Sequence, residues 1–141
     1  MKGKLLVLAQ FILIFLIIYY GQLNINGVVS LTLLFIGLLI GFLAIINMRF
    51  SVNVFPEVRK SQQLVTSGIY KYIRHPMYSA VLLTTASFVV GKFSWLVALL
   101  WLILLAVLVV KLNYEEEILV KNFKQYSKYK HATKRLIPFI I

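Results

Sequence analysis

The polar side chains that can support chemistry gather in two short segments of an otherwise apolar chain. The first segment, residues 62–78, holds Arg74, His75 and several tyrosines. The second segment, residues 111–117, reads KLNYEEE and holds three adjacent glutamates. A carboxylate that faces the basic side chains of the first segment is well placed to bind hydroxyl groups or a cation. The chemistry therefore depends on a fold that brings the two segments together.

Each segment also has a plain structural explanation when it is taken alone. Three adjacent carboxylates repel one another and are typical of a solvated helix face, and they are unfavourable at the negative end of a helix dipole. A histidine that precedes proline at a membrane surface, as in His75-Pro76, is often only a capping group. The second histidine, His131, lies far from His75 in the sequence, so their spacing predicts no metal site.

Four apolar runs predict the elements that position these segments, and they indicate an all-α, polytopic membrane helical bundle. Hydrophobic residues make up 61% of the 141 residues, more than a soluble domain of this size can bury. The second run is close to the roughly 20 residues that cross the hydrocarbon core, whereas the third covers only about 21 Å. The third and fourth runs predict a helical hairpin over residues 77–112, with Pro76 in its first turn. The four runs are residues 5–20, 28–46, 77–90 and 95–112.

Charge predicts the orientation of a single membrane domain, residues 1–141. With four spans, 14 of the 15 Lys and Arg residues fall on the side that holds both termini, and only Lys92 is opposite. Positively charged loops stay inside, so the termini and the site are expected in the cytoplasm, at a bacterial or archaeal cell membrane. The expected parts are two spans (1–48), a cytoplasmic cofactor loop (49–76), the hairpin (77–112), and an interfacial helix and tail (113–141) that continue the fourth helix up to Pro138.

Two spaced motifs occupy the two polar segments. The pattern G-x-Y-x-x-x-R-H-P-x-Y runs from Gly68 to Tyr78, and the pattern E-E-x-x-L-x-x-x-F runs from Glu115 to Phe123. Tyrosines at 126 and 129 and a proline at 138 follow the second motif. In this order, behind two further spans, the motifs resemble the isoprenylcysteine carboxyl methyltransferase family, to which phospholipid methyltransferases are related. The resemblance covers residues 62–138, more than half of the chain.

The resemblance implies a membrane methyltransferase that uses S-adenosylmethionine as its methyl donor and acts on a lipophilic acceptor, such as a carboxylate. The family places its acceptor contact at the position of Lys111, and Arg74 is grouped with it as a catalytic candidate. A carboxylate can accept hydrogen bonds from the ribose diol of this cofactor, and aromatic faces suit its sulfonium. The candidate cofactor contacts are Gln62, Gln63, Leu64, Val65, Tyr70, His75, Pro76, Met77, Tyr78 and the paired carboxylates Glu115 and Glu116.

Three departures from the family pattern bear on the acceptor and on the packing. Ala80 and Lys124 each stand where the family usually has glycine, and Lys111 stands where it usually has arginine. Lysine lacks the planar fork that matches a carboxylate, so the departure at Lys111 puts the type of acceptor in doubt. A phospholipid or amine methyltransferase of the same type is therefore the first alternative.

Two further alternatives belong to other classes of protein. Sterol reductases that bind NADPH carry a similar R-H-P-x-Y segment, but they usually have paired aspartates and a tryptophan where Tyr126 stands. A non-enzymatic transport subunit should carry ionisable groups inside its spans, and the middle of these spans carries none. The net charge of +11 lies between and after the apolar runs, which favours lipid headgroups over nucleic acid as partners.

Overall fold

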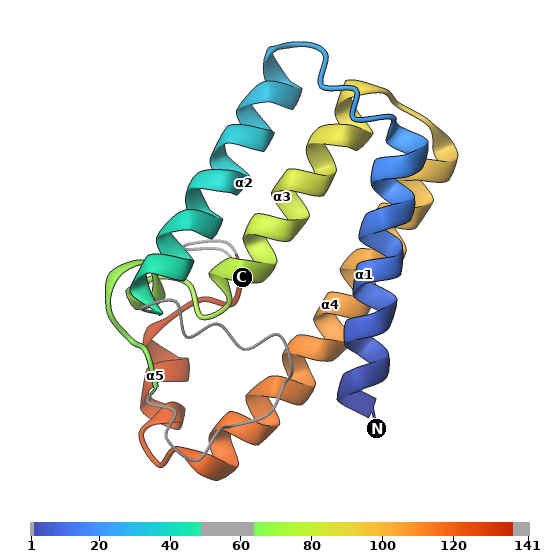
Figure 1. Cartoon of the computed structure of the whole chain (residues 1–141). Helices are drawn as coiled ribbons and strands as arrows, with labels where there is room; N and C mark the ends of the chain where they lie inside the picture. The colour runs from blue at the N-terminus through green and yellow to red at the C-terminus, as the bar shows by residue number, and fades with distance from the viewer. Residues whose placement is uncertain (1, 49–63, 137–141) are drawn as a thin grey trace.

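The described residues fold into an antiparallel bundle of four helices with a short fifth helix beside one end (Figure 1). The structure is a computed structural model that describes residues 2–48 and 64–136. Within these ranges it is all-helical, which confirms the predicted fold class. The elements are α1 (Lys2–Gly21), α2 (Val28–Asn47), the 3₁₀ turn η1 (Gly68–Lys71), α3 (Pro76–Gly91), α4 (Trp95–Asn122) and α5 (Tyr126–Ala132).

Helix α3 is the central helix, because it packs against α2, α1 and α4. Its closest neighbour is α2, and glycines on α2 make this approach possible. A Cβ atom at Gly37 would lie 2.6 Å from Thr84 Oγ1, and one at Gly41 would lie 3.3 Å from Ala80 Cβ. The four-residue glycine spacing therefore serves close helix packing rather than lipid contact. Ala80 is helical, so its departure from glycine is tolerated.

Three of the helices, α1, α2 and α4, are long and apolar enough to cross a membrane. The 16 residues of α3 make it shorter, at about 24 Å. The polar side chains Ser79, Thr85 and Ser87 of α3 are buried, and their hydroxyls donate hydrogen bonds to backbone carbonyls. Large apolar side chains are exposed along α1, α2 and α4, as expected for lipid-facing surfaces of an integral membrane protein. Examples are Leu5, Phe15, Phe35, Phe42, Leu99 and Leu102.

The fourth helix continues beyond the predicted span, as expected, but the prediction that it runs unbroken through the tail is wrong. Helix α4 ends at Asn122, where Phe123 takes an extended conformation, and α5 begins three residues later. The chain turns because the residues after α5 pair with the segment before α3. The Arg74 backbone N–H donates to the Lys134 carbonyl at 2.8 Å, and the His75 N–H donates to the Arg135 carbonyl at 3.0 Å. Tertiary pairing thus overrides the helical pattern of the tail, and Pro138 lies outside the described residues.

The 3₁₀ turn η1 is fixed to the end of α2 by one asparagine. The Asn47 side-chain oxygen accepts a hydrogen bond from the Ile69 N–H at 2.7 Å. Gly68 has a φ of +60°, and a Cβ atom there would lie 1.7 Å from Asn47 Oδ1. Only glycine fits a positive φ and such a close approach, so the first glycine of the motif is explained by geometry. The turn places the buried Tyr70 beside the start of α3.

Candidate active site

The two polar segments meet at the end of the bundle that carries α5. Arg74 Nε donates to Glu116 Oε1 at 2.9 Å, and the Tyr78 hydroxyl donates to Glu115 Oε2 at 2.5 Å. Pro76 is at the start of α3, as predicted. His75 directly precedes this helix and Tyr78 lies in its first turn, and both face the side of α4 that carries the glutamates. The expectation that the hairpin brings both segments together is confirmed.

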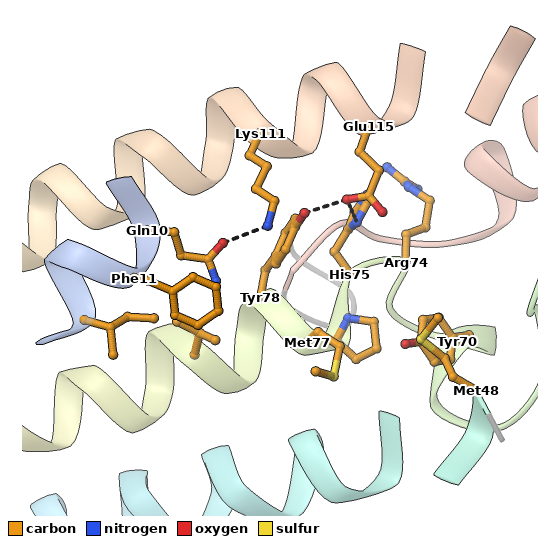
Figure 2. A pocket seen from close by; sticks show the side chains of 13 residues that line it. Gln10, Phe11, Met48, Tyr70, Arg74, His75, Met77, Tyr78, Lys111 and Glu115 are labelled. Carbon is orange, nitrogen blue, oxygen red and sulfur yellow. Dashed lines mark hydrogen bonds and ion pairs between the residues drawn. The ribbon is translucent and has the colours of Figure 1, made fainter. Parts of the chain in front are cut away.

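A cavity of about 270 Å³ opens next to this junction (Figure 2). Its polar end is formed by residues of both motifs, and its other end reaches between α1 and α3 to apolar side chains. The cavity therefore joins a polar site to the apolar interior of the bundle, which suits a ligand with a polar head and an apolar tail. The lining residues are Gln10, Phe11, Ile14, Met48, Tyr70, Arg74, His75, Pro76, Met77, Tyr78, Val81, Lys111 and Glu115.

A smaller cavity of about 70 Å³ lies on the α5 side of the same residues. Both cavities share five lining residues, so a common wall separates them: Met48, Tyr70, Arg74, His75 and Glu115. Leu119, Phe123 and Tyr126 also line the smaller cavity. Leu119 belongs to α4 and Tyr126 to α5, while Phe123 lies between the two helices.

Glu115 stands between the two cavities with part of its carboxylate free. Its side chain is 29% exposed, and the Tyr78 hydroxyl is its hydrogen-bond donor. The Nδ1 atom of His75 lies 4.0 Å from Glu115 Oε2, and the imidazole stacks in parallel on the Tyr78 ring, with 5.4 Å between the ring centroids. A carboxylate has about four lone-pair positions, so Glu115 keeps capacity to accept hydrogen bonds from ligand hydroxyls.

Lys111 lies one helical turn before Glu115 and is only 2% exposed. Its ammonium donates to the Gln10 side-chain oxygen at 2.7 Å and lies 5.1 Å from the centroid of the Tyr78 ring. Figure 2 shows these side chains in sequence along the cavity. We call Gln10, Lys111, Tyr78 and Glu115 the Lys111–Glu115 wall.

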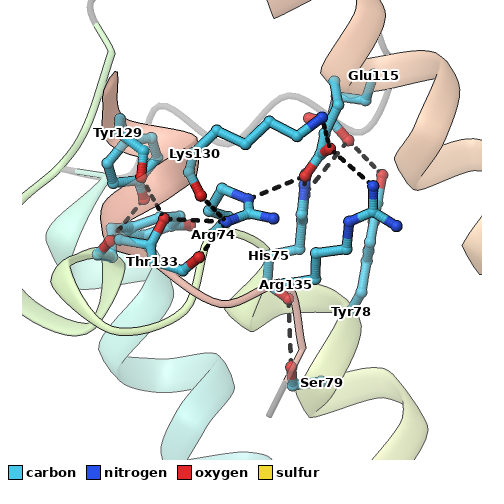
Figure 3. A network of polar contacts seen from close by, with 11 residues as sticks. Arg74, His75, Tyr78, Ser79, Glu115, Tyr129, Lys130, Thr133 and Arg135 are labelled. Atoms are coloured by element: carbon cyan, nitrogen blue, oxygen red, sulfur yellow. Dashed lines mark hydrogen bonds and ion pairs between the residues drawn. The ribbon is translucent and has the colours of Figure 1, made fainter. Parts of the chain in front are cut away.

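Glu116, the next residue on α4, has different surroundings. Figure 3 shows the polar network to which Arg74, Lys130 and Arg135 belong. Its side chain is 3% exposed, and Arg74, Lys130 and Arg135 approach it at 2.9, 3.1 and 3.3 Å. Arg74 also donates to the backbone carbonyls of Lys130 and Thr133. We call Arg74, Glu116, Lys130 and Arg135 the Glu116 cluster. It ties α4 and the start of α3 to α5, and Glu116 does not line either cavity described above.

The tyrosines around the smaller cavity keep their protons at neutral pH. Burial raises the pKa of Tyr129 to about 12. Burial, followed by nearby tyrosine and carboxylate charge, also raises the pKa of Tyr70. The Tyr129 hydroxyl donates to the Tyr70 carbonyl at 2.5 Å and so holds η1 against α5. Because these phenols keep their protons, they are poor general bases.

Most of the predicted site residues come together, but they divide into groups. Tyr70, Arg74, His75 and Glu115 line both cavities, whereas Pro76, Met77, Tyr78 and Lys111 line the larger one, and Leu64 and Val65 line the smaller one. Gln62 and Gln63 lie outside the described residues. Arg74 and Glu116 are bound to each other and to the tail. Glu117 is exposed and lines neither of the two cavities described above.

Five residues that line the larger cavity were not predicted from the sequence: Gln10, Phe11, Ile14, Met48 and Val81. Gln10 carried a usable signal, because it is the single polar side chain between Leu5 and Ile18 in the first apolar run. A buried polar group within a span needs a partner, and that partner is Lys111. Met48 carried no such signal, because it lines the cavity only through its position directly after the end of α2.

Comparison with protein families assigns the chain to a family. The model of the phospholipid methyltransferase family matches residues 25–126, more than two thirds of the chain. The chain therefore belongs to the phospholipid methyltransferase family, a class of membrane methyltransferases. The match gives no support to the narrower assignment to isoprenylcysteine carboxyl methyltransferases. No curated protein and no solved structure matches the chain.

Proposed function

We propose that the protein transfers a methyl group from S-adenosylmethionine to a lipid acceptor in the bilayer, most directly the amino headgroup of a phospholipid. The observation that carries this proposal is the pair of adjoining cavities at the α5 end, whose common wall includes the motif residues Tyr70, His75 and Glu115. The family match supports methyl transfer, and the apolar extension of the larger cavity supports a lipophilic acceptor.

Several polar atoms around the cavities fit the cofactor. Glu115 offers free lone pairs for the ribose hydroxyls. Within the described part of the chain, the buried Tyr126 hydroxyl has no hydrogen-bond partner, and an unpaired buried polar group at a cavity often serves a ligand. His75 Nε2, by contrast, lies 3.4 Å from Glu116 Oε1. The faces of the tyrosines suit a sulfonium. S-adenosylmethionine supplies a methyl group on a positively charged sulfur, which leaves as a neutral thioether when an acceptor lone pair attacks.

The residues of the larger cavity align the acceptor and exclude water. The apolar tail lies against Phe11, Ile14 and Val81, and the polar head points toward Glu115. An amino acceptor reacts as the free amine, after its proton has passed to water, because the neutral Tyr70 does not take it. A carboxylate acceptor needs no such step. Lys111 in the cavity wall favours a carboxylate as the second candidate.

Equilibrium binding of S-adenosylmethionine to the purified protein in detergent tests the proposal. We expect saturable binding, and we expect Glu115→Gln to weaken it roughly tenfold to a hundredfold, since a hydrogen bond to a charged group contributes about 1.5–3 kcal/mol. The exposed Glu117 provides the matched control, so Glu117→Gln should bind normally. An assay of labelled methyl transfer to phosphatidylethanolamine and to a prenylated cysteine then shows which of the two acceptors the protein methylates. Absence of cofactor binding by the folded native protein would rule the function out.

We further propose that the α5 end faces the cytoplasm. The connection between α3 and α4, which begins at Lys92, lies at the opposite end of the bundle from α5 (Figure 1). The other 14 of the 15 basic residues are expected on the α5 side. The chain has no cysteine, so single cysteines can be introduced freely. In intact cells an impermeant thiol reagent should label Ser94→Cys and leave Ser127→Cys, on α5, unlabelled. The reverse pattern would invert the orientation.

A further inference from the structure

Gln10 is the polar residue of α1 that reaches the cavity. Its side chain is buried, with 6% of its surface exposed, and its oxygen accepts a hydrogen bond from Lys111 Nζ at 2.7 Å. Helix α1 precedes the segment matched by the family model, which begins at residue 25. A single buried amide in an apolar helix is costly unless it has a partner, so the pairing with Lys111 accounts for its presence.

The ammonium of Lys111 is incompletely compensated. Its close partners are a neutral amide and the face of the Tyr78 ring. Among residues 2–48 and 64–136, no carboxylate lies within ion-pair distance of it; Glu115 instead accepts a hydrogen bond from Tyr78. An ammonium has three N–H donors, and Gln10 uses one of them. A buried charge with only neutral partners that also lines a cavity has capacity left for an anion.

We propose that Gln10 is a positioning residue that holds Lys111 as an oxyanion-binding group in the larger cavity. The acceptor would then carry an anionic oxygen group, a phosphate or a carboxylate, close to the atom that receives the methyl group. This inference rests on the proposed function, and it extends that function to a helix outside the matched segment. The neutral amide matters, because a carboxylate at position 10 would orient Lys111 equally well but would neutralise its charge.

The test compares Gln10→Glu with the native protein. Glutamate has nearly the size of glutamine and keeps the hydrogen bond to Lys111, so the fold should be retained. In cofactor-free protein in a non-ionic detergent, we expect dodecyl phosphate and dodecanoate to bind at least roughly tenfold more weakly to Gln10→Glu, while binding of dodecanol is unchanged. The native protein's preference between the two anions identifies the source of the oxyanion.

The chain offers a matched control at the other end of the bundle. Gln22 also accepts a hydrogen bond from a lysine, Lys92, so Gln22→Glu makes the same amide-to-carboxylate change away from the cavity. This control should bind both anions as the native protein does. If Gln10→Glu does not fold, Gln10→Met carries the test, because it removes the hydrogen bond that orients Lys111 and should weaken both anions in the same way.

A kinetic measurement separates this inference from the proposed function. Gln10→Glu should raise KM for the phosphate-bearing acceptor phosphatidylethanolamine at least roughly tenfold and leave kcat nearly unchanged. It should leave KM for oleylamine, which has no phosphate, and the Kd for S-adenosylmethionine unchanged. Unaltered anion binding by folded Gln10→Glu or Gln10→Met overturns the role of Gln10. Failure of the native protein to bind S-adenosylmethionine would instead contradict the proposed function and leave the anion-binding result intact.

Discussion

Glu115 and Glu116 are neighbours on α4, yet they belong to two regions with opposite electrostatic character. In the Glu116 cluster, one carboxylate with 3% exposure faces three cations at 3.3 Å or less. In the Lys111–Glu115 wall, the charges are separated by Tyr78, and each is held mainly by neutral groups. Adjacent residues on a helix point about 100° apart, which places one glutamate toward the tail and the other toward the cavities.

The difference separates charges that hold the fold from charges that can take a ligand. A buried carboxylate surrounded by cations has little to gain from a further partner, whereas removing one of those cations leaves a charge uncompensated. A half-exposed carboxylate and an ammonium with free N–H groups stay ready to bind. We therefore infer that the Glu116 cluster holds α5 and Arg135 against the start of α3, whereas the Lys111–Glu115 wall binds the ligand.

The largest expected effect comes from breaking the Glu116 cluster. Glu116→Gln leaves Arg74 buried without its carboxylate and should lower the free energy of unfolding by about 3–5 kcal/mol. The measurement is a denaturant titration in detergent, followed by tryptophan fluorescence. Arg74→Met should cost a similar amount, and the double variant should cost less than the sum because the two residues are coupled. A Glu116→Gln protein of native stability that fails to bind S-adenosylmethionine would instead place Glu116 among the cofactor ligands.

Tyr78→Phe probes the other region, and its main effect should be on binding. The change removes the hydroxyl that orients Glu115 and keeps both the stacking on His75 and the aromatic face toward Lys111. We expect S-adenosylmethionine to bind roughly tenfold more weakly, with stability lowered by only about 1 kcal/mol, because the half-exposed Glu115 can be hydrated. A stability loss as large as that of Glu116→Gln would remove the distinction between the two regions.

These two regions also show which features of the fold and of the site can be predicted from the sequence. The apolar runs, Pro76 and the order of the motifs were enough to predict the bundle and the meeting of the two segments. The glutamate run did not indicate which carboxylate faces the cavity, because that depends on how α4 is rotated against α3. The helical pattern of the tail was misleading, since the backbone bonds of Arg74 and His75 to residues after α5 are long-range contacts without a local signal.

Tyr126→Phe tests whether an unpaired hydroxyl at the smaller cavity serves a ligand. In the described residues the buried Tyr126 hydroxyl has no hydrogen-bond partner, so its removal should leave the ligand-free protein as stable or more stable by up to about 1 kcal/mol. If the cofactor uses this hydroxyl, the same variant should bind S-adenosylmethionine several-fold more weakly. Thermal unfolding with and without the cofactor measures both effects in one experiment. A clear loss of stability without the cofactor would show that the hydroxyl has a structural partner.

Lys130→Met should give the smallest effect, because it removes the most exposed cation of the Glu116 cluster. The Lys130 side chain is 41% exposed, and its ammonium lies 3.1 Å from Glu116 Oε2. An ion pair that water can reach is worth at most about 1 kcal/mol, and salt screens it. The backbone carbonyl of Lys130, which accepts a hydrogen bond from Arg74, is kept in the variant.

We expect the free energy of unfolding of Lys130→Met to fall by less than about 1 kcal/mol, and this loss should shrink further in 1 M salt. The loss in Arg74→Met should persist in 1 M salt because that cation is buried. Equal salt sensitivity of the two variants would mean that water reaches the whole cluster, and the contrast with the Lys111–Glu115 wall would no longer hold.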